Sequence, residues 1–324
     1  MTPHDTPSKP PRWSLPLWLR MGIGLALLAA AALVMRHQLE AYTLAQVVRG
    51  LRSLPLWRVA GCVILTVLGY LALIGHDVIG LQHLRITVAR RRIALAAFVA
   101  YAFSNSAPVS FAVAGALRFR FYSKWGMDAA DTSRLVGLTL STYVLGLLAA
   151  TAFALSLGHF PMPGFLHLPF HDTLPIGIAA GVILVTYVLW SGARGKALGA
   201  THHEALGPTL GFAASQVGIS LANWILSAAA LYILVSHEQP LSFGVFFGAF
   251  ILGRLVALIA QLPGGIGVFD AVVIWALRSV VPPPATLAAL FGYRVIYFLL
   301  PLLLAVGLLF FHEGRSLFRR RKPL

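Results

Sequence analysis

The sequence has few acidic residues and few charged residues of either sign. It has 10 Asp and Glu against 25 Lys and Arg in 324 residues, so charged residues make up 11% of the chain. Soluble domains average about 25%. Hydrophobic residues make up 58% and come in long runs, which is more apolar surface than one soluble core can hide. This composition excludes a soluble enzyme or a nucleic-acid-binding domain and predicts a polytopic membrane protein.

Three further absences narrow the class. Cys62 is the only cysteine and cannot pair within the chain, which excludes a disulfide scaffold. No Gly-rich stretch ends in Lys-Ser or Lys-Thr, so there is no P-loop for ATP. The histidines in 167–171 and 202–204 lack further ligands nearby. We therefore expect no metal, no cofactor and no enzyme activity, because no nucleophile, base and orienting residue can be grouped.

The long apolar runs are separated by short polar segments. Most runs can cross about 30 Å of hydrocarbon at about 1.5 Å per residue. We predict an all-α, polytopic membrane bundle of about eight spans in residues 15–312, between a cytoplasmic tail at 1–14 and a basic cytoplasmic tail at 313–324. The runs cover residues 21–35, 59–75, 93–117, 135–157, 175–191, 210–235, 243–260, 266–281 and 285–311.

The distribution of basic residues predicts the orientation. The loops at 158–174 and 236–242 have no Lys or Arg, whereas 85–92 has four Arg and the C-terminal tail has five basic residues. By the positive-inside rule, both termini face the cytoplasm of a bacterial inner membrane. The segment 36–58, which has four Arg, is the one loop that disagrees with this topology.

The apolar run at 93–117 is interrupted by a polar stretch that includes Asn105 and ends at Pro108. Both flanks of the run are basic, so both of its ends should face the cytoplasm. A re-entrant helical hairpin satisfies this condition, and its unwound turn is tolerated at membrane depth only where protein or a water-filled cavity surrounds it. Asn105 can hydrogen-bond between helices there, or reach a lipid headgroup.

A second break lies in the other half of the chain. It contains Pro263, Gly264, Gly265 and Gly267, and both residue types disfavour a helix interior. Backbone N–H groups left free at the following helix start can bind an anion such as a lipid phosphodiester. The short run at 266–281 is either a crossing or a re-entrant half. We favour a crossing, because it would return the basic C-terminus to the cytoplasm. One break in each half is typical of transporters built from inverted repeats.

Four charged residues lie where charge is costly. Arg254 lies within an uninterrupted apolar run, where insertion costs at least about 2.5 kcal/mol. Asp270, in the first turn of the helix after the second break, is its candidate partner, and this pair either orders the fold or binds a headgroup. Arg294 poses the same question in the last run. Arg118 shares a helix face with Tyr122, where its guanidinium either snorkels to the surface or binds a lipid phosphate.

Three stretches of the sequence are familiar. They are residues 115–127 (GALRFRFYSKWGM), 262–271 (LPGGIGVFDA) and 293–301 (YRVIYFLLP). They resemble the transmembrane-region family of lysylphosphatidylglycerol synthase, and more narrowly the flippase module of the multiple peptide resistance factor. The resemblance is to a stand-alone form without the soluble synthase domain. Asp270 stands where the family usually has Glu, which keeps the charge on a shorter side chain.

The resemblance implies that the protein moves aminoacylated phosphatidylglycerol, typically the lysyl form, from the inner to the outer leaflet. Such movement lowers the negative charge of the surface and the sensitivity to cationic antimicrobial peptides. Membrane phospholipids are then the partners, and the expected headgroup ligands are Asn105, Arg118, Arg254, Asp270 and Arg294.

Two other classes fit the composition. One is an accessory subunit of a separate lipid-modifying transferase, docked on basic inner loops, and the other is an ion-coupled transporter of a soluble solute. No nucleic-acid partner is expected, and homo-oligomerisation is left open.

Overall fold

The computed structural model describes residues 54–106, 110–157, 171–198, 209–235, 241–260 and 267–320. The predicted N-terminal tail and the first apolar run lie outside these residues. So do four residues of the predicted helix breaks, namely Pro108, Pro263, Gly264 and Gly265.

All elements within the described residues are helices, which confirms the all-α prediction. They are α3 (Leu56–His83), α4 (Arg90–Ser106), α5 (Ser110–Lys124), α6 (Ala129–Leu157), α7 (Leu174–Leu198), α8 (Leu210–Tyr232), α9 (Phe243–Ala260), α10 (Val268–Leu277), α11 (Pro283–Tyr293), the π-helical segment η3 (Arg294–Leu299) and α12 (Leu300–Arg320). Five helical stretches in this part of the chain are long and apolar enough to cross a membrane, namely those in α3, α6, α7, α8 and the rod from α11 to α12. The protein is therefore a polytopic membrane helical protein, while the number of about eight spans stays a prediction.

Several helix ends follow from local chemistry. The Asp128 carboxylate accepts a hydrogen bond of 2.7 Å from the backbone N–H of Asp131 at the start of α6, and the Thr209 hydroxyl accepts one from Phe212 at the start of α8. Both satisfy N–H groups that have no partner within the helix. Pro283 occupies the first turn of α11, where its missing N–H costs nothing.

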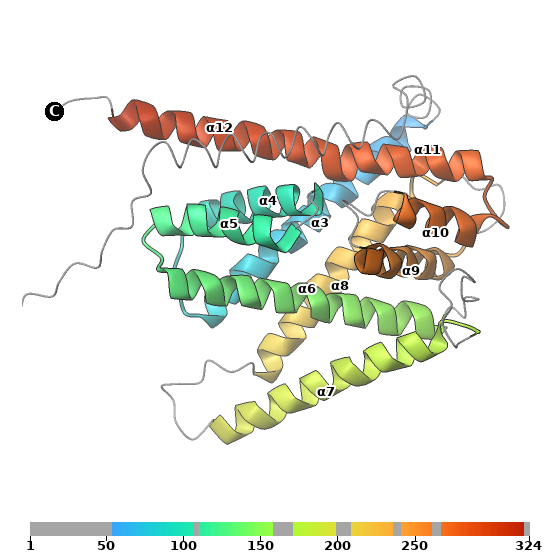
Figure 1. The fold of residues 1–324 in the computed structure, drawn as a ribbon, viewed down its shortest axis with the longest axis horizontal. Coiled ribbons are helices and arrows are strands. Elements are labelled where there is room, and N and C mark those ends of the chain that lie inside the picture. Colours follow the sequence, from blue (N-terminus) through green and yellow to red (C-terminus); the bar gives the residue numbers. More distant parts are fainter. Residues whose placement is uncertain are drawn as a thin grey trace, which may run out of the picture.

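Each predicted helix break lies between the two members of a pair of shorter helices. Helices α4 and α5 pack against each other, and so do α9 and α10. Figure 1 shows the α4/α5 pair on the left and the α9/α10 pair on the right, between the α11–α12 rod above and α6 below. Each half of the chain therefore has a long helix, a pair of shorter helices and another long helix in the same order. This is the order that the predicted repeat requires, and the inverted symmetry itself stays a prediction.

The run at 266–281 forms a helix of only 10 residues, α10. Such a helix spans about 15 Å, half of the hydrocarbon thickness. It doubles back against α9 instead of continuing away from it. This geometry favours the re-entrant half over the crossing.

The buried apolar side chains form two clusters, one around each pair of shorter helices. The first includes Phe246, Phe250 and Val273 of the α9/α10 pair. The second includes Leu117 and Phe121 of α5 together with residues of α3, α4 and α12. Each helix pair is thus held in its own core, so the two pairs have separate packing surfaces.

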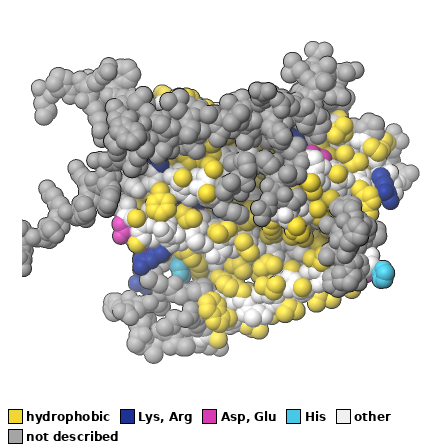
Figure 2. Space-filling model, in the orientation of Figure 1, with side chains coloured by type: hydrophobic (Ala, Val, Ile, Leu, Met, Phe, Trp, Pro, Cys, Tyr) yellow, Lys and Arg dark blue, Asp and Glu magenta, His cyan; other side chains and the backbone are white. Residues whose placement is uncertain are grey.

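The outer surface is apolar over most of the described part. Figure 2 shows hydrophobic side chains across the face in view, with the visible Lys, Arg, Asp and His side chains mainly near its left and right edges. Helix α7 has the most exposed face of the candidate spans, with 17% of its apolar window buried. Lipid chains can cover this surface at no cost, because they are as apolar as the side chains.

Helices α6 and α8 approach each other closely at Gly146. A Cβ atom at this position would lie 2.0 Å from the Ser220 hydroxyl oxygen and 2.8 Å from the Ser220 backbone carbon. We expect Gly146→Ala to destabilise the protein by about 1–3 kcal/mol, because the helices must separate. Gly137→Ala on the same helix is the control, since nothing lies within 4 Å of its Cβ position. Thermal unfolding in detergent should show a lower midpoint for Gly146→Ala alone; equal midpoints would contradict the close packing.

Candidate functional site

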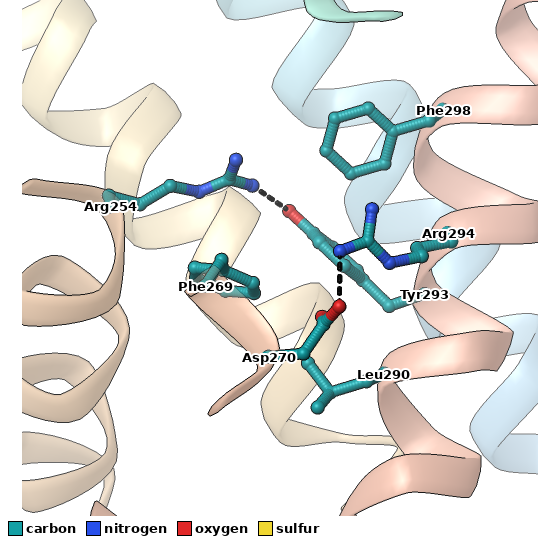
Figure 3. Close-up of a pocket in the computed structure, with 7 residues that line it drawn as sticks. All are labelled: Arg254, Phe269, Asp270, Leu290, Tyr293, Arg294 and Phe298. Atoms are coloured by element: carbon teal, nitrogen blue, oxygen red, sulfur yellow. Dashed lines mark hydrogen bonds and ion pairs between the residues drawn. The ribbon is translucent and has the colours of Figure 1, made fainter. Parts of the chain in front are cut away.

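The candidate site lies where α9, α10 and the α11–η3 junction meet. Figure 3 shows that Arg254 and Arg294 enter it from opposite sides, the first from α9 and the second from η3. The pocket has no room for a water-sized sphere in this conformation, so a ligand must part the side chains. The lining side chains are Arg254, Phe269, Asp270, Leu290, Tyr293, Arg294 and Phe298.

Asp270 holds the start of α10 together and pairs with Arg294. Gly267, the residue before α10, has φ of +81° and donates its backbone N–H to Asp270 Oδ2 at 3.1 Å. An acidic side chain in the first helical turn commonly reaches back in this way, and the helix dipole favours it. Arg294 Nη2 donates to the same oxygen at 2.6 Å. The expectation that Arg254 is the partner of Asp270 is therefore wrong.

Arg294 reaches Asp270 from the wider π-helical segment η3, which the sequence analysis did not foresee. Pro301 lies just after this segment and has no N–H to donate to the carbonyl of Tyr297, four residues before it. The Tyr70 hydroxyl of α3 donates to that carbonyl instead, at 3.3 Å. Such single π turns are frequent at functional sites. Pro301 was the one available signal in the sequence, because a proline inside an apolar run disturbs the helix before it.

Arg254 lies among aromatic rings rather than beside a carboxylate. Its guanidinium carbon is 4.6 Å from the ring centre of Phe269, 5.1 Å from that of Phe250 and 5.5 Å from that of Phe298. Its Nη2 donates to the Tyr293 hydroxyl at 3.2 Å. Among the described residues no carboxylate pairs with Arg254. The pocket side chains therefore have two guanidiniums and one carboxylate, a net charge of +1.

Arg118 lies in a second buried cluster, away from the pocket. Its Nε and Nη2 donate to the Asp77 carboxylate at 3.0 and 2.7 Å, and the Tyr122 hydroxyl donates to the same carboxylate at 3.0 Å. Arg118 is only 2% exposed, so the snorkelling alternative is wrong. Its guanidinium lies over the Tyr101 ring at 4.6 Å, and Tyr101 also contacts His76 at 3.3 Å. The structure does not bring Arg118 together with the pocket residues.

The sequence analysis missed Asp77 and Tyr293. The apolar run predicted over 59–75 ends two residues before Asp77. In the structure, α3 continues to His83, and apolar residues lie on both sides of His76 and Asp77. Continued apolar periodicity beyond the two polar residues was the signal that could have found this intramembrane carboxylate.

Asn105 does not line the pocket, but a chain of tyrosines links it to the pocket. Its Nδ2 donates to the Tyr70 hydroxyl at 3.4 Å. The Tyr70 ring lies 5.8 Å from the ring of Tyr297, which stacks on Tyr293 of the pocket at 4.9 Å. The Tyr297 hydroxyl also bonds to Ser227 of α8. Asn105, which lies before the first break, is thus connected to the charged pocket through Tyr70 and Tyr297.

Among the described residues near the pocket, Gly267 is the one glycine whose backbone conformation requires glycine. At φ of +81° a residue with a Cβ is strained, although nothing lies within 4 Å of the added atom. We expect Gly267→Ala to cost about 1–3 kcal/mol of stability and to displace the N–H that binds Asp270. Gly218→Ala in α8, which also adds its Cβ to open space, is the matched control. Unfolding midpoints in detergent that fall equally for both variants would contradict a specific role for the Gly267 conformation.

The pocket and the Asp77–Arg118 cluster both lie in a region that matches a known protein family. Residues 18–305 match the family model described as the lysylphosphatidylglycerol synthase TM region. The chain belongs to this family. The match includes the pocket, the tyrosine chain and the Asp77–Arg118 cluster, so all three lie within the family's own domain.

Two relatives align with this chain over most of their own length. Uncharacterized protein slr0712 of Synechocystis sp. is 30% identical over 282 residues, which are 86% of this chain and 87% of that protein. Inner membrane protein YbhN of Escherichia coli is 26% identical over 300 residues, 91% of this chain and 92% of that protein. Phosphatidylglycerol lysyltransferase of Staphylococcus haemolyticus is 36% identical over 100 residues, 30% of this chain and 12% of that protein. The alignments thus run along most of the length of the first two relatives, whereas they cover 12% of the lysyltransferase.

Proposed function

We propose that the protein moves phospholipids between the two leaflets of a bacterial inner membrane, with the headgroup passing through the protein and the acyl chains staying in the bilayer. The observation that carries this proposal is the pocket at Arg254. There, two guanidiniums and one carboxylate lie among aromatic side chains, where an uncompensated positive charge attracts an anion strongly. Phosphate is the anion that every phospholipid headgroup offers to an arginine.

The side chains around the pocket supply the roles that such movement needs. Arg254 is held by Tyr293 and by aromatic faces alone, so its guanidinium can turn to a phosphate without breaking an ion pair. Arg294 can donate to the same phosphate while it keeps its bond to the Asp270 carboxylate. The closed pocket opens when the headgroup enters.

The description of the family suggests lysylphosphatidylglycerol as the transported lipid. Its headgroup carries a net charge of about +1, and moving one positive charge outward against an inside-negative potential costs about 2.3 kcal/mol per 100 mV. Synthesis in the inner leaflet by a separate transferase, or a coupled ion, would have to supply this energy. Export of this lipid would reduce the negative charge of the outer surface and the binding of cationic antimicrobial peptides.

Reconstitution into liposomes tests the proposal. Phospholipids with a fluorophore on one acyl chain are quenched by a membrane-impermeant reductant, and complete quenching reports exchange between the leaflets. We expect fast exchange with the protein, and a loss of at least about tenfold in rate for Arg254→Met, which removes the phosphate ligand. Arg278→Met is the matched control, since Arg278 also lies over an aromatic ring, 5.4 Å from that of Trp275, but is exposed and outside the pocket.

Equal rates for the two variants would contradict the pocket as the headgroup site. Exchange no faster than in protein-free liposomes, for every lipid tried, would overturn lipid movement. Co-purification of a lipid-modifying transferase with the inactive protein would then establish the accessory-subunit alternative.

A further inference from the structure

The pocket has three buried polar atoms whose hydrogen-bonding capacity is unused. In the described part of the chain, Nε of Arg254, Nε of Arg294 and Oδ1 of Asp270 are buried and have no hydrogen-bond partner. Each such atom is costly in an apolar surrounding unless a ligand satisfies it. The set consists of two donors on guanidiniums and one acceptor on a carboxylate. It matches a ligand with two acceptor oxygens of a phosphate and one neighbouring donor.

The charge of the pocket adds a second constraint. Arg254, Arg294 and Asp270 sum to +1, and residues 261–266, which precede Gly267 in the sequence, include no charged residue. A headgroup with net charge −1 neutralises this sum, whereas one with net charge of about +1 adds to it in a medium that screens charge poorly. The site therefore favours an anionic headgroup over a cationic one.

A lysyl headgroup would bring two ammonium groups, and the pocket offers little to either. Asp270 Oδ2 already accepts from Arg294 and from the Gly267 N–H, which leaves Oδ1 for one donor. Aromatic faces are the other usual partners of an ammonium, but the guanidinium of Arg254 already lies over the rings of Phe250, Phe269 and Phe298. A second ammonium group would enter the pocket without a counter-charge.

We propose that the cargo of this site is an anionic phosphodiester lipid whose headgroup donor is a hydroxyl, as in unmodified phosphatidylglycerol, in preference to an aminoacylated lipid with net positive charge. The phosphate oxygens accept from both Nε atoms, and one glycerol hydroxyl donates to Asp270 Oδ1. This inference rests on the proposed function and narrows it to one class of phospholipid.

The test uses the liposome exchange assay at zero membrane potential, with three acyl-labelled probes that differ only in the headgroup. Phosphatidylglycerol has net charge −1 and hydroxyls, phosphatidylethanol has the same charge without a hydroxyl, and lysylphosphatidylglycerol has a net positive charge. We expect phosphatidylglycerol to exchange about tenfold faster than the lysyl lipid, with phosphatidylethanol between them. Arg254→Gln, which lowers the pocket charge to zero, should slow phosphatidylglycerol most and narrow its advantage over the lysyl lipid.

Each outcome separates this inference from the proposed function. A lysyl lipid that exchanges as fast as phosphatidylglycerol, or faster, would overturn the anionic preference while lipid movement stands. Phosphatidylethanol that keeps pace with phosphatidylglycerol would overturn the hydroxyl contact to Asp270. Exchange of none of the three above the protein-free rate would overturn the proposed function itself.

Discussion

Removing either partner of the Arg294–Asp270 ion pair should destabilise the protein by about 3–5 kcal/mol, while removing both should largely restore stability and still slow lipid exchange. The two side chains are each 6% exposed, and Arg294 Nη2 lies 2.6 Å from Asp270 Oδ2. Arg294→Met leaves a buried carboxylate without a counter-charge, and Asp270→Asn leaves a buried guanidinium. The double variant leaves neither, so the energetic penalty of an unpaired charge disappears.

The double variant separates folding from function. It removes one of the two guanidiniums that bind the phosphate and the negative charge of the acceptor for the headgroup donor, so exchange should fall by at least about tenfold even when the fold is intact. Unfolding midpoints and exchange rates should therefore be measured on the same preparations of both single variants and the double variant. A double variant with full exchange would show that the pair only orders the fold.

Asp77→Asn should destabilise the protein by a similar amount, about 3–5 kcal/mol. Asp77 is fully buried and receives two bonds from Arg118 and one from the Tyr122 hydroxyl. The neutral amide keeps the size of the side chain but leaves the Arg118 guanidinium charged and buried. Helices α3 and α5 are joined through this carboxylate, so its loss should loosen the α4/α5 pair from the rest of the bundle.

Asp131→Asn is the matched control for Asp77→Asn. Asp131 also pairs with an arginine, Arg134 at 3.0 Å, but the two side chains are 33% and 54% exposed. Exposed pairs contribute at most about 1 kcal/mol, so this variant should unfold close to the wild-type midpoint. The measurement is the midpoint of thermal unfolding in detergent. Equal midpoints for the two variants would contradict a stabilising role of burial at Asp77.

The predictions that followed from residue chemistry alone held where the chemistry is local. Helices form along the apolar runs because a backbone in lipid must satisfy its own hydrogen bonds, and the structure confirms long helices over 56–83, 129–156, 174–193, 210–232 and 285–311. The interruption after Asn105 and the one before Asp270 were also foreseen, since Pro and Gly act on the backbone at their own positions.

The identity of ion-pair partners could not be predicted in the same way. Arg254 and Asp270 are 16 positions apart and Arg294 and Asp270 are 24 apart, so sequence distance favoured the wrong pair. Which guanidinium reaches the carboxylate depends on how α9, α10 and η3 pack. The pairing of Asp77 with Arg118 depends on tertiary packing in the same way, because the two residues lie 41 positions apart.

The sequence by itself determined the class of protein, the positions of its helices and breaks, and the small set of charged residues that must find partners in an apolar surrounding, because these depend on composition and local backbone chemistry. Only the tertiary structure decided that Asp270 neutralises Arg294, that Asp77 neutralises Arg118, and that Arg254 is left among aromatic rings in a pocket of net charge +1. Charge pairing acts over a few ångströms in space, and the fold alone sets which residues come that close.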